Sequence, residues 1–173
     1  MCLDELPDLC TRLVLWHCSA KDACVARLVC KKWRAAVLRW KLRVVCNNAQ
    51  FDALARCAHA LRHLHTLNTY GCTGITDIRA LAGIHALDMG KCTGITDVSA
   101  LAGIHTLLMH GCTGITDVSA LADIRELWMD GCTGITDVSA LVGIRELHIT
   151  RTQEHRVQGI DALRAAGCAM IVW

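Results

Sequence analysis

Hydrophobic and polar residues recur with a period of 20 residues over the second half of the chain. The segment 71–90 reads GCTGITDIRALAGIHALDMG, and three near copies follow it up to residue 150. Near the end of the first copy, Leu87 and Met89 alternate with small or polar neighbours, which is the period-two pattern of a strand with one buried face. Thr93-Gly94 then signals a turn. Each copy is therefore predicted to contain one short strand.

A second short element is predicted between this turn and the next strand. Thr96-Asp97 precedes the apolar Val98 and Leu101, and an Asp or Thr side chain there can accept N–H bonds at the start of a single helical turn. Gly103 closes that turn at a position suited to a positive φ. Because the unit is short, a tight turn or a 3₁₀ segment is expected on this side rather than a full helix.

One unit of this size cannot bury its own apolar stripe, but stacked units can. The array resembles the leucine-rich repeat, whose pattern LxxLxLxx(N/C)xL stands here as Ile84-x-x-Leu87-x-Met89-x-x-Cys92-x-x-Ile95. The resemblance covers about 64–150, with a partial fifth copy at Leu64-x-x-Leu67. The stretch GITDVSALAGI is also similar to bacterial internalin-type repeats. The resemblance implies an α/β fold whose repeats form a short solenoid with a concave sheet face. The positions expected to superpose on their copies are Ile84, Leu87, Met89, Ile95, Val98 and Leu101.

The N-terminal part of the chain reads as helices instead. Leu6-Pro7 opens the first, because proline is tolerated in a first turn. Apolar residues then follow at helical spacing in two groups, Leu9, Leu13 and Trp16, then Val25, Leu28, Val29 and Trp33. The string from Leu6-Pro7 to Val29-Cys30-Lys31-Lys32-Trp33-Arg34 resembles an F-box over about 4–40. Cys18 and Ala23 depart from it, since the family usually has leucine there.

The F-box resemblance implies a helical module that docks a Skp-type adaptor and, through it, a cullin ubiquitin ligase. The residues expected to form or support the adaptor contact are Leu6, Pro7, Val14, Leu15, Val29 and Trp33. The resulting division of the chain is an F-box-like helical module at 1–45, a linking or capping helix at 46–63, leucine-rich repeats at 64–150 and a C-terminal cap at 151–173. Within the cap, a helix is predicted at 160–166 and an edge strand at 169–173.

Charge is distributed unevenly, although the whole chain carries a formal net charge of only +2. Residues 1–65 hold 11 Lys and Arg against 5 Asp and Glu, and the remainder is acidic. A basic run with interleaved tryptophans, from Lys31 to Arg43, could contact nucleic acid. A solvated helix face with Trp33 and Trp40 buried is the favoured interpretation, so no nucleic-acid partner is expected. No apolar run approaches the ~20 residues needed to span a bilayer, and no secretory signal is seen, so no membrane partner is expected.

Cysteine is abundant, with 12 in the chain. Cys72, Cys92, Cys112 and Cys132 stand 20 residues apart. A straight row of thiols does not offer the tetrahedral geometry of zinc, and no CxxC pair occurs. We therefore predict reduced thiols packed under the turns of an intracellular protein. The location expected is the cytoplasm or nucleus, in the host cell if the protein is viral.

A metal or catalytic site made from the cysteine and histidine pool is the weaker alternative. His59 and His63 share a face of the helix predicted at 46–63 and could bind a metal with Cys57 or Cys46, but further ligands would have to be found. No phosphate loop, nucleophile elbow or pair of carboxylates on one helix face occurs. We therefore predict no catalytic, cofactor-binding or metal-binding residue, and no enzymatic activity.

Comparison of the copies points to a binding surface. The two residues that flank the inward methionine differ in every copy, and both should point onto the concave sheet face. A third outward column is formed by Ala86, Thr106, Glu126 and Glu146. Sequence drift at positions that packing does not constrain is the alternative explanation of this variation. Drift rarely leaves a tryptophan exposed, however, and Trp128 is expected to be substantially exposed on this face. The face is small, about 300 Å², so it suits a peptide or a small protruding element. Larger targets would need the loops with His85, His105, Arg125 and Arg145. The expected target-binding residues are Asp88, Leu108, His110, Trp128, Asp130 and His148.

Together these features predict a substrate-recognition adaptor of an SCF-type cullin ubiquitin ligase. Its F-box would dock the Skp-type adaptor, and its repeats would bind a protein or peptide target. The alternative is a free-standing leucine-rich-repeat scaffold in which a degenerate F-box, with Cys18 and Ala23, serves only as an N-terminal cap.

Overall fold

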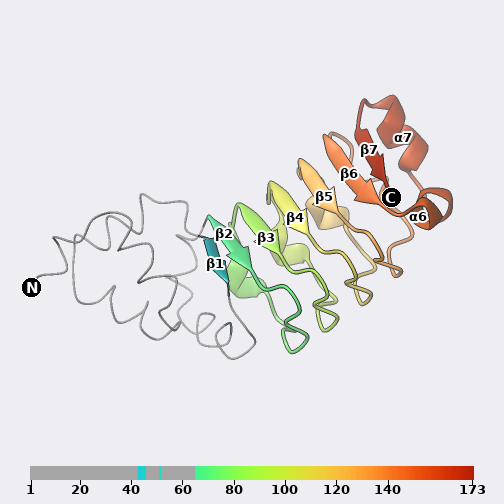
Figure 1. Ribbon diagram of the computed structural model, residues 1–173. Helices are drawn as coiled ribbons and strands as arrows, with labels where there is room; N and C mark the ends of the chain where they lie inside the picture. The colour runs from blue at the N-terminus through green and yellow to red at the C-terminus, as the bar shows by residue number, and fades with distance from the viewer. Residues whose placement is uncertain (1–42, 46–50, 52–64) are drawn as a thin grey trace, which may run out of the picture.

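The computed structural model of the chain describes residues 43–45, 51 and 65–173. In this part of the chain, seven strands form one parallel sheet in which sequence order is also spatial order (Figure 1). Strands β2 to β6 are short because each belongs to one 20-residue sequence unit. Their bounds are β1 Arg43–Val45, β2 Thr66–Asn68, β3 Ala86–Asp88, β4 Thr106–Leu108, β5 Glu126–Trp128, β6 Glu146–Ile149 and β7 Ala169–Val172.

The register of the sheet follows the sequence period. Leu87 pairs with Leu107, and Leu107 pairs with Leu127, so that each residue lies beside its own copy. These leucines are at most 1% exposed, and Met89 and Met109 are fully buried. The strand register predicted from the alternation of Leu87 and Met89 is therefore confirmed. Because the period is the same in every unit, the buried side chains form continuous columns through the stack.

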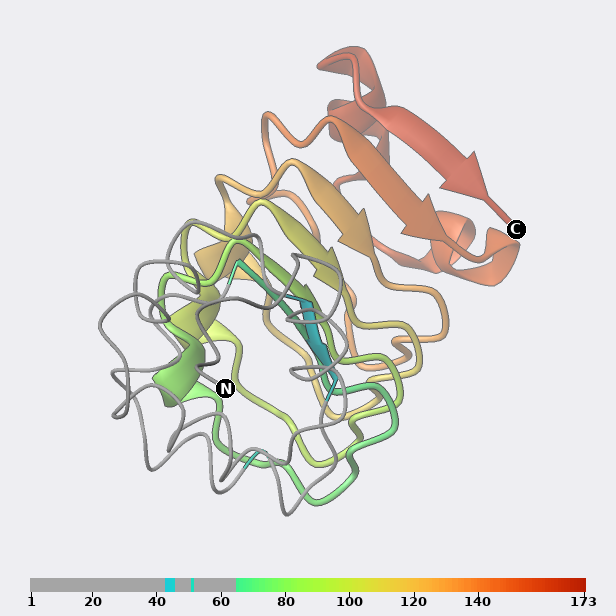
Figure 2. The same ribbon diagram turned by 60° about the vertical axis from the view of Figure 1, so that its left-hand side comes forward.

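In the first three full copies, a short 3₁₀ helix lies on the side of the unit opposite the strand (Figure 2), whereas the fourth copy has a turn at this place. These helices are η2 Arg79–Leu81, η3 Ser99–Leu101 and η4 Ser119–Leu121. The aspartate before each helix holds its first turn, as predicted from Asp97. Asp97 Oδ1 accepts the Ser99 N–H at 2.8 Å, and Asp117 does the same for Ser119 at 2.8 Å. The predicted preference for a 3₁₀ segment over a full helix is confirmed at these three positions.

The turn that closes each 3₁₀ helix is built in two different ways. Gly103 has φ +80°, the positive value that its position predicted, and Ala102 before it has φ −51° and ψ 129°. These angles are typical of a type II turn, which favours glycine at its third position. The next copy carries Asp123 there, and Ala122 before it is helical at φ −54° and ψ −32°. A turn that begins with a helical residue needs no positive φ, so the aspartate is accommodated.

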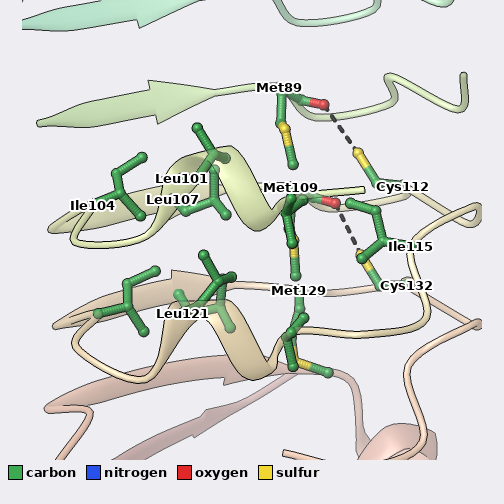
Figure 3. Packing of buried hydrophobic residues seen from close by; sticks show 14 of the residues in the cluster. Met89, Leu101, Ile104, Leu107, Met109, Cys112, Ile115, Leu121, Met129 and Cys132 are labelled. Atoms are coloured by element: carbon green, nitrogen blue, oxygen red, sulfur yellow. Dashed lines mark hydrogen bonds between the residues drawn. The ribbon is translucent and has the colours of Figure 1, made fainter. Parts of the chain in front are cut away.

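The methionines and cysteines form two neighbouring columns in the core (Figure 3). Cys112 Sγ donates to the carbonyl of Met89 at 3.0 Å, and Cys132 Sγ donates to that of Met109 at 2.9 Å. These cysteines are fully buried and free of disulfides. Burial raises the pKa of Cys112 to about 12 and that of Cys132 to about 11. The prediction of packed thiols is therefore confirmed for this ladder.

The C-terminal end of the sheet is closed by two helices and an edge strand. Helix α7 (Ile160–Ala165) and β7 lie where a helix and an edge strand are predicted. Helix α6 (Arg151–Arg156) was not anticipated. Its Gln153 is 3% exposed and donates to the carbonyls of Met129 at 2.8 Å and Cys132 at 3.2 Å. The Met129 carbonyl is the last in the ladder, and no cysteine thiol among the described residues donates to it. Gln153 donates to it in place of such a thiol.

The N-terminal edge of the sheet requires a correction. Residues 43–45 were predicted to belong to a helical module, but they form β1, which pairs in parallel with β2. The β-branched pair Val44-Val45 favours an extended chain, and β2 offers an edge for it to join. Phe51 is helical and 2% exposed. The six adaptor-contact residues, the rest of the predicted helices, and His59, His63, Cys57 and Cys46 lie outside the described residues. In the described part of the chain, no helix is both long and apolar enough to cross a membrane.

Candidate binding face on the outer side of the sheet

Three rows of side chains cross the face of the sheet opposite the leucine and methionine core. They come from β2 to β7 and from the residues that immediately follow these strands. We call them the first, second and third rows. The first is Thr66, Ala86, Thr106, Glu126, Glu146 and Ala169, the second is Asn68, Asp88, Leu108, Trp128, His148 and Ile171, and the third is Tyr70, Gly90, His110, Asp130, Thr150 and Trp173. The rows contain four carboxylates and no lysine or arginine.

Trp128 and His148 form the centre of the second row. Their rings are stacked, with centroids 3.7 Å apart and planes 13° from parallel. Trp128 is half-buried, so its ring is less exposed than predicted. His148 is only 2% exposed, because Trp128 covers one side of it and Ile171 of β7 pairs with it on the other. Of these two predicted target-binding residues, Trp128 is accessible and His148 acts mainly as its support.

Two glutamates in the first row lie next to this stack. Glu126 Oε1 accepts the indole N–H of Trp128 at 2.9 Å, and the Thr106 hydroxyl donates to Glu126 Oε2 at 3.3 Å. Glu146 Oε1 lies 3.0 Å from His148 Nε2. One ligand atom from each of Glu126, Glu146 and His148 lies within 4.8 Å of the others. Sequence reasoning recognised these glutamates as an outward column but did not connect them with His148.

Asp130 in the third row has an unusual environment. Desolvation by burial raises the pKa of its carboxyl, while a hydrogen bond from its own backbone N–H and electrostatic attraction to His148 and His110 lower it. Asp130 Oδ1 and His148 Nδ1 are both buried without a hydrogen-bond partner. His110 is half-buried and lies against Tyr70, with ring centroids 5.4 Å apart. The third row therefore contains a carboxylate with one buried oxygen that has no hydrogen-bond partner in the chain.

The remaining predicted residues lie on the same face. Asp88 accepts a hydrogen bond from the Asn68 amide at 2.9 Å and one from the Gly90 N–H at 3.2 Å, so its carboxylate is already engaged. Leu108 is half-buried beside Trp128, with which it pairs in register. The structure thus brings the six predicted target-binding residues onto one surface, and among these six Leu108 and Trp128 are the accessible apolar residues.

A separate column precedes the strands. The rings of His65, His85 and His105 lie against one another in a tilted arrangement, with centroid separations of 4.2 Å and 4.1 Å. The same column continues with Arg125 and Arg145, which are exposed. This column borders the first row, so the basic side chains lie at the margin of the face rather than within it.

Comparison with known proteins adds information on the N-terminal segment. Residues 3–45 match the family model of the F-box domain. No curated protein matches the chain. An F-box domain implies in general an adaptor role in SCF-type ubiquitin ligases, in which F-box domains bind Skp-type adaptors and so join cullin ligases. Proteins with an F-box are typically non-enzymatic adaptors.

Proposed function

We propose that this protein is a substrate-recognition adaptor of an SCF-type cullin ubiquitin ligase. The F-box match at residues 3–45 is the observation that carries the proposal. In this proposal the F-box docks the Skp-type adaptor through Leu6, Pro7, Val14, Leu15, Val29 and Trp33. The chain supplies binding and proximity, and its partners transfer ubiquitin. The complex acts in the cytoplasm or nucleus, with neither a membrane nor a nucleic acid as its partner.

We further propose that the repeats are a leucine-rich-repeat solenoid whose outer sheet face binds the target. The parallel sheet with its 20-residue register supports this assignment. The core positions recur in each copy, whereas the second row changes from Asp88 to Leu108 to Trp128. Variable residues on a regular framework of repeats are typical of a surface that binds a partner. The width of the face suits a peptide or a small protruding element of the target.

The adaptor role can be tested by co-purification. The full chain, expressed with a Skp-type adaptor and a cullin, should retain both through affinity purification. Leu6→Ala with Pro7→Ala should abolish this retention, because truncated anchor residues typically cost 2 kcal/mol or more in binding. The matched control is Asp123→Asn, which changes an exposed turn residue far along the sequence. Undiminished retention by the double variant would contradict the assigned contact.

One observation favours the alternative that the F-box segment caps the repeats. Strand β1 lies inside the matched segment 3–45 and pairs with β2, so the segment continues directly into the sheet. A purely capping role predicts that wild-type protein fails to retain the adaptor. It also predicts that Leu6→Ala with Pro7→Ala lowers the thermal stability of the repeats. An adaptor role predicts retention by the wild type and folded repeats in the variant.

A further inference from the structure

We propose that Glu126, Glu146 and His148 form a binding site for a divalent metal ion of the zinc type on the outer face of the sheet. Two adjacent strands supply the three side chains. Glu126 in β5 pairs directly with Glu146 in β6, and His148 stands two residues after Glu146 on the same face. One carboxylate oxygen of each glutamate and one ring nitrogen of His148 lie within 4.8 Å of one another. This places one nitrogen and two oxygen ligands around a common point.

The two carboxylates lack a cationic partner of their own. Like charges on directly opposed residues of neighbouring strands destabilise a sheet. Within the described part of the chain, neither glutamate forms an ion pair with a lysine or arginine, and His148 is the one basic group in contact with Glu146. Glu126 is held by neutral donors, the Trp128 indole and the Thr106 hydroxyl. These bonds fix the carboxylate but leave its charge uncompensated, which a bound cation would correct.

His148 is placed as a metal ligand would be. It is 2% exposed and fixed by the stack with Trp128, so its ring cannot turn out to solvent. Its Nε2 lies 3.0 Å from Glu146 Oε1, which is close to the separation of two ligands around one ion. Ligation through Nε2 leaves the ring proton on Nδ1, an atom that is buried and without a partner. Metal-bound histidines commonly donate that proton to a carboxylate, and Asp130 has a buried oxygen that also lacks a partner.

The ligand set selects the class of ion. Imidazole nitrogen suits zinc and its neighbours, whereas magnesium favours an all-oxygen octahedron. Three protein ligands leave a position for water or for a group from outside the chain. The ladder cysteines, such as Cys112 and Cys132, bond to main-chain carbonyls in the core. They lie on the opposite face of the sheet and are not ligands of this ion.

Calorimetric titration of the full chain with Zn²⁺ tests the site. Cysteine thiols elsewhere in the chain can also bind zinc, so the result is decided by comparing wild type with variants of the proposed ligands. Wild type should bind one equivalent more than Glu126→Gln with Glu146→Gln, or bind it at least tenfold more tightly. Asp123→Asn, a matched loss of an exposed carboxylate, should behave as wild type. Excess Mg²⁺ should not displace the zinc. Identical isotherms for wild type and the double variant would overturn the proposal.

Cobalt in place of zinc provides a second readout. Wild type should show visible absorption of Co²⁺ bound by nitrogen and oxygen, absent from the double variant, without the near-ultraviolet charge-transfer band of thiolate ligands. Should the double variant not fold, Glu146→Gln alone serves, because an amide oxygen can still accept the bond from His148. A thiolate band that accounts for all bound cobalt would overturn the site. So would zinc-independent binding of a lysine-rich peptide that the double variant loses, since the carboxylates would then serve a cationic target side chain.

Discussion

The thiol of Cys132 donates a hydrogen bond to the main-chain carbonyl of Met109, 2.9 Å away and 23 residues earlier in the sequence. That carbonyl also accepts the N–H of Cys112 from its own unit, at 3.0 Å. The Met109 carbonyl oxygen therefore accepts one hydrogen bond from its own unit and one from the next unit along the chain. The same arrangement recurs between Cys112 and Met89. The cysteines are thus small apolar side chains that also supply one donor each to the stack.

Removal of one such thiol should weaken the repeats moderately. Cys132→Ala deletes a hydrogen bond and leaves a small cavity, but the Met109 carbonyl keeps its bond to Cys112. We expect a loss of about 1–2 kcal/mol in the free energy of unfolding. Urea denaturation measures this loss, and Cys132→Ser, which retains a donor, should lose less. A change no larger than that of Asp123→Asn would show that the ladder contributes nothing to stability.

The buried thiols should be chemically inert in the folded protein. With a pKa of about 12 for Cys112 and about 11 for Cys132, their thiolate forms are scarce at pH 8. Because the folded state keeps these thiols protonated to a higher pH than the unfolded state does, they contribute stability that is fully present below the ordinary thiol pKa of 9.0. This contribution is lost as pH rises toward 11–12. Mass spectrometry after iodoacetamide treatment at pH 8 should find both cysteines unmodified until urea is added. Rapid labelling of either cysteine in native protein would contradict their burial.

The sheet register could be predicted from sequence because it depends on local alternation repeated at a fixed period. The positions of Leu87 and Met89 are apolar in every copy although the residues between and beside them change, so an inward position in one unit is inward in all. The cap formed by Asp97 and the turn at Gly103 are likewise local, since their partners lie within a few residues. Asp123 shows the limit of such a local prediction. It stands where the other copies have glycine, and its turn is of a different type although the fold is the same.

The features that sequence analysis missed depend on residues distant in the chain. His148 is buried because β7 pairs beside it and Trp128 stacks on it, and neither contact follows from the repeat pattern. Gln153 lies in a short helix, and its role is visible only once the main-chain carbonyls of Met129 and Cys132, to which it donates, are located. Strand β1 was not predicted, because residues 43–45 were assigned to the helical module at 1–45. The glutamates at 126 and 146 were recognised as outward, but their proximity to His148 required the actual side-chain positions.

Acid should weaken the repeats through their helix-capping aspartates. Hydrogen bonds from Ser99 lower the pKa of Asp97, and Arg79 holds that of Asp77 at about 2. A lowered pKa contributes stability that is present above the unfolded value near 3.9 and is lost as pH falls toward 2. Urea midpoints measured between pH 5 and pH 2 should therefore fall. Asp97→Asn with Asp117→Asn should show a shallower fall, and an unchanged slope would exclude these caps as its source.

Lys91 occupies a position that favours glycine. Its φ is +60°, whereas the equivalent residues of the other copies are glycines with φ between +70° and +74°. Lys91→Gly should relieve this conformation and raise the melting temperature by about 2–4 °C. The Lys91 ammonium lies 5.5 Å from the Tyr70 ring, an exposed contact that offsets little of the gain. Lys91→Ala is the control, because it loses that contact and keeps the positive φ. A rise as large in Lys91→Ala would mean that the side chain, and not the backbone, is the source of strain.

Trp128 should affect both target binding and stability, and two substitutions separate these effects. Trp128→Ala removes from the accessible part of the face a side chain of a type enriched in binding hot spots, and it should weaken target binding about 30-fold. It also uncovers His148, so we expect a loss of about 1–2 kcal/mol in the free energy of unfolding, more than a fully exposed ring would cost. Trp128→Phe retains a ring over His148 and loses only the bond to Glu126, so its stability should stay near that of wild type.

Affinity capture from a eukaryotic lysate with quantitative mass spectrometry measures the binding effect, and urea denaturation measures the stability effect. Proteins that wild type captures and Trp128→Ala loses are the candidate targets of the face. They should be retained by variants altered only in the F-box, because Leu6 and Pro7 are assigned to a different partner. Leu127 and Met129 on either side of Trp128 are fully buried, so Trp128 lies on the outer face of the sheet. A loss of capture by Trp128→Ala therefore reports on that outer face. If Trp128→Ala captures the same proteins as wild type, the target does not bind around Trp128, and the accessible apolar part of the second row has no role in recognition.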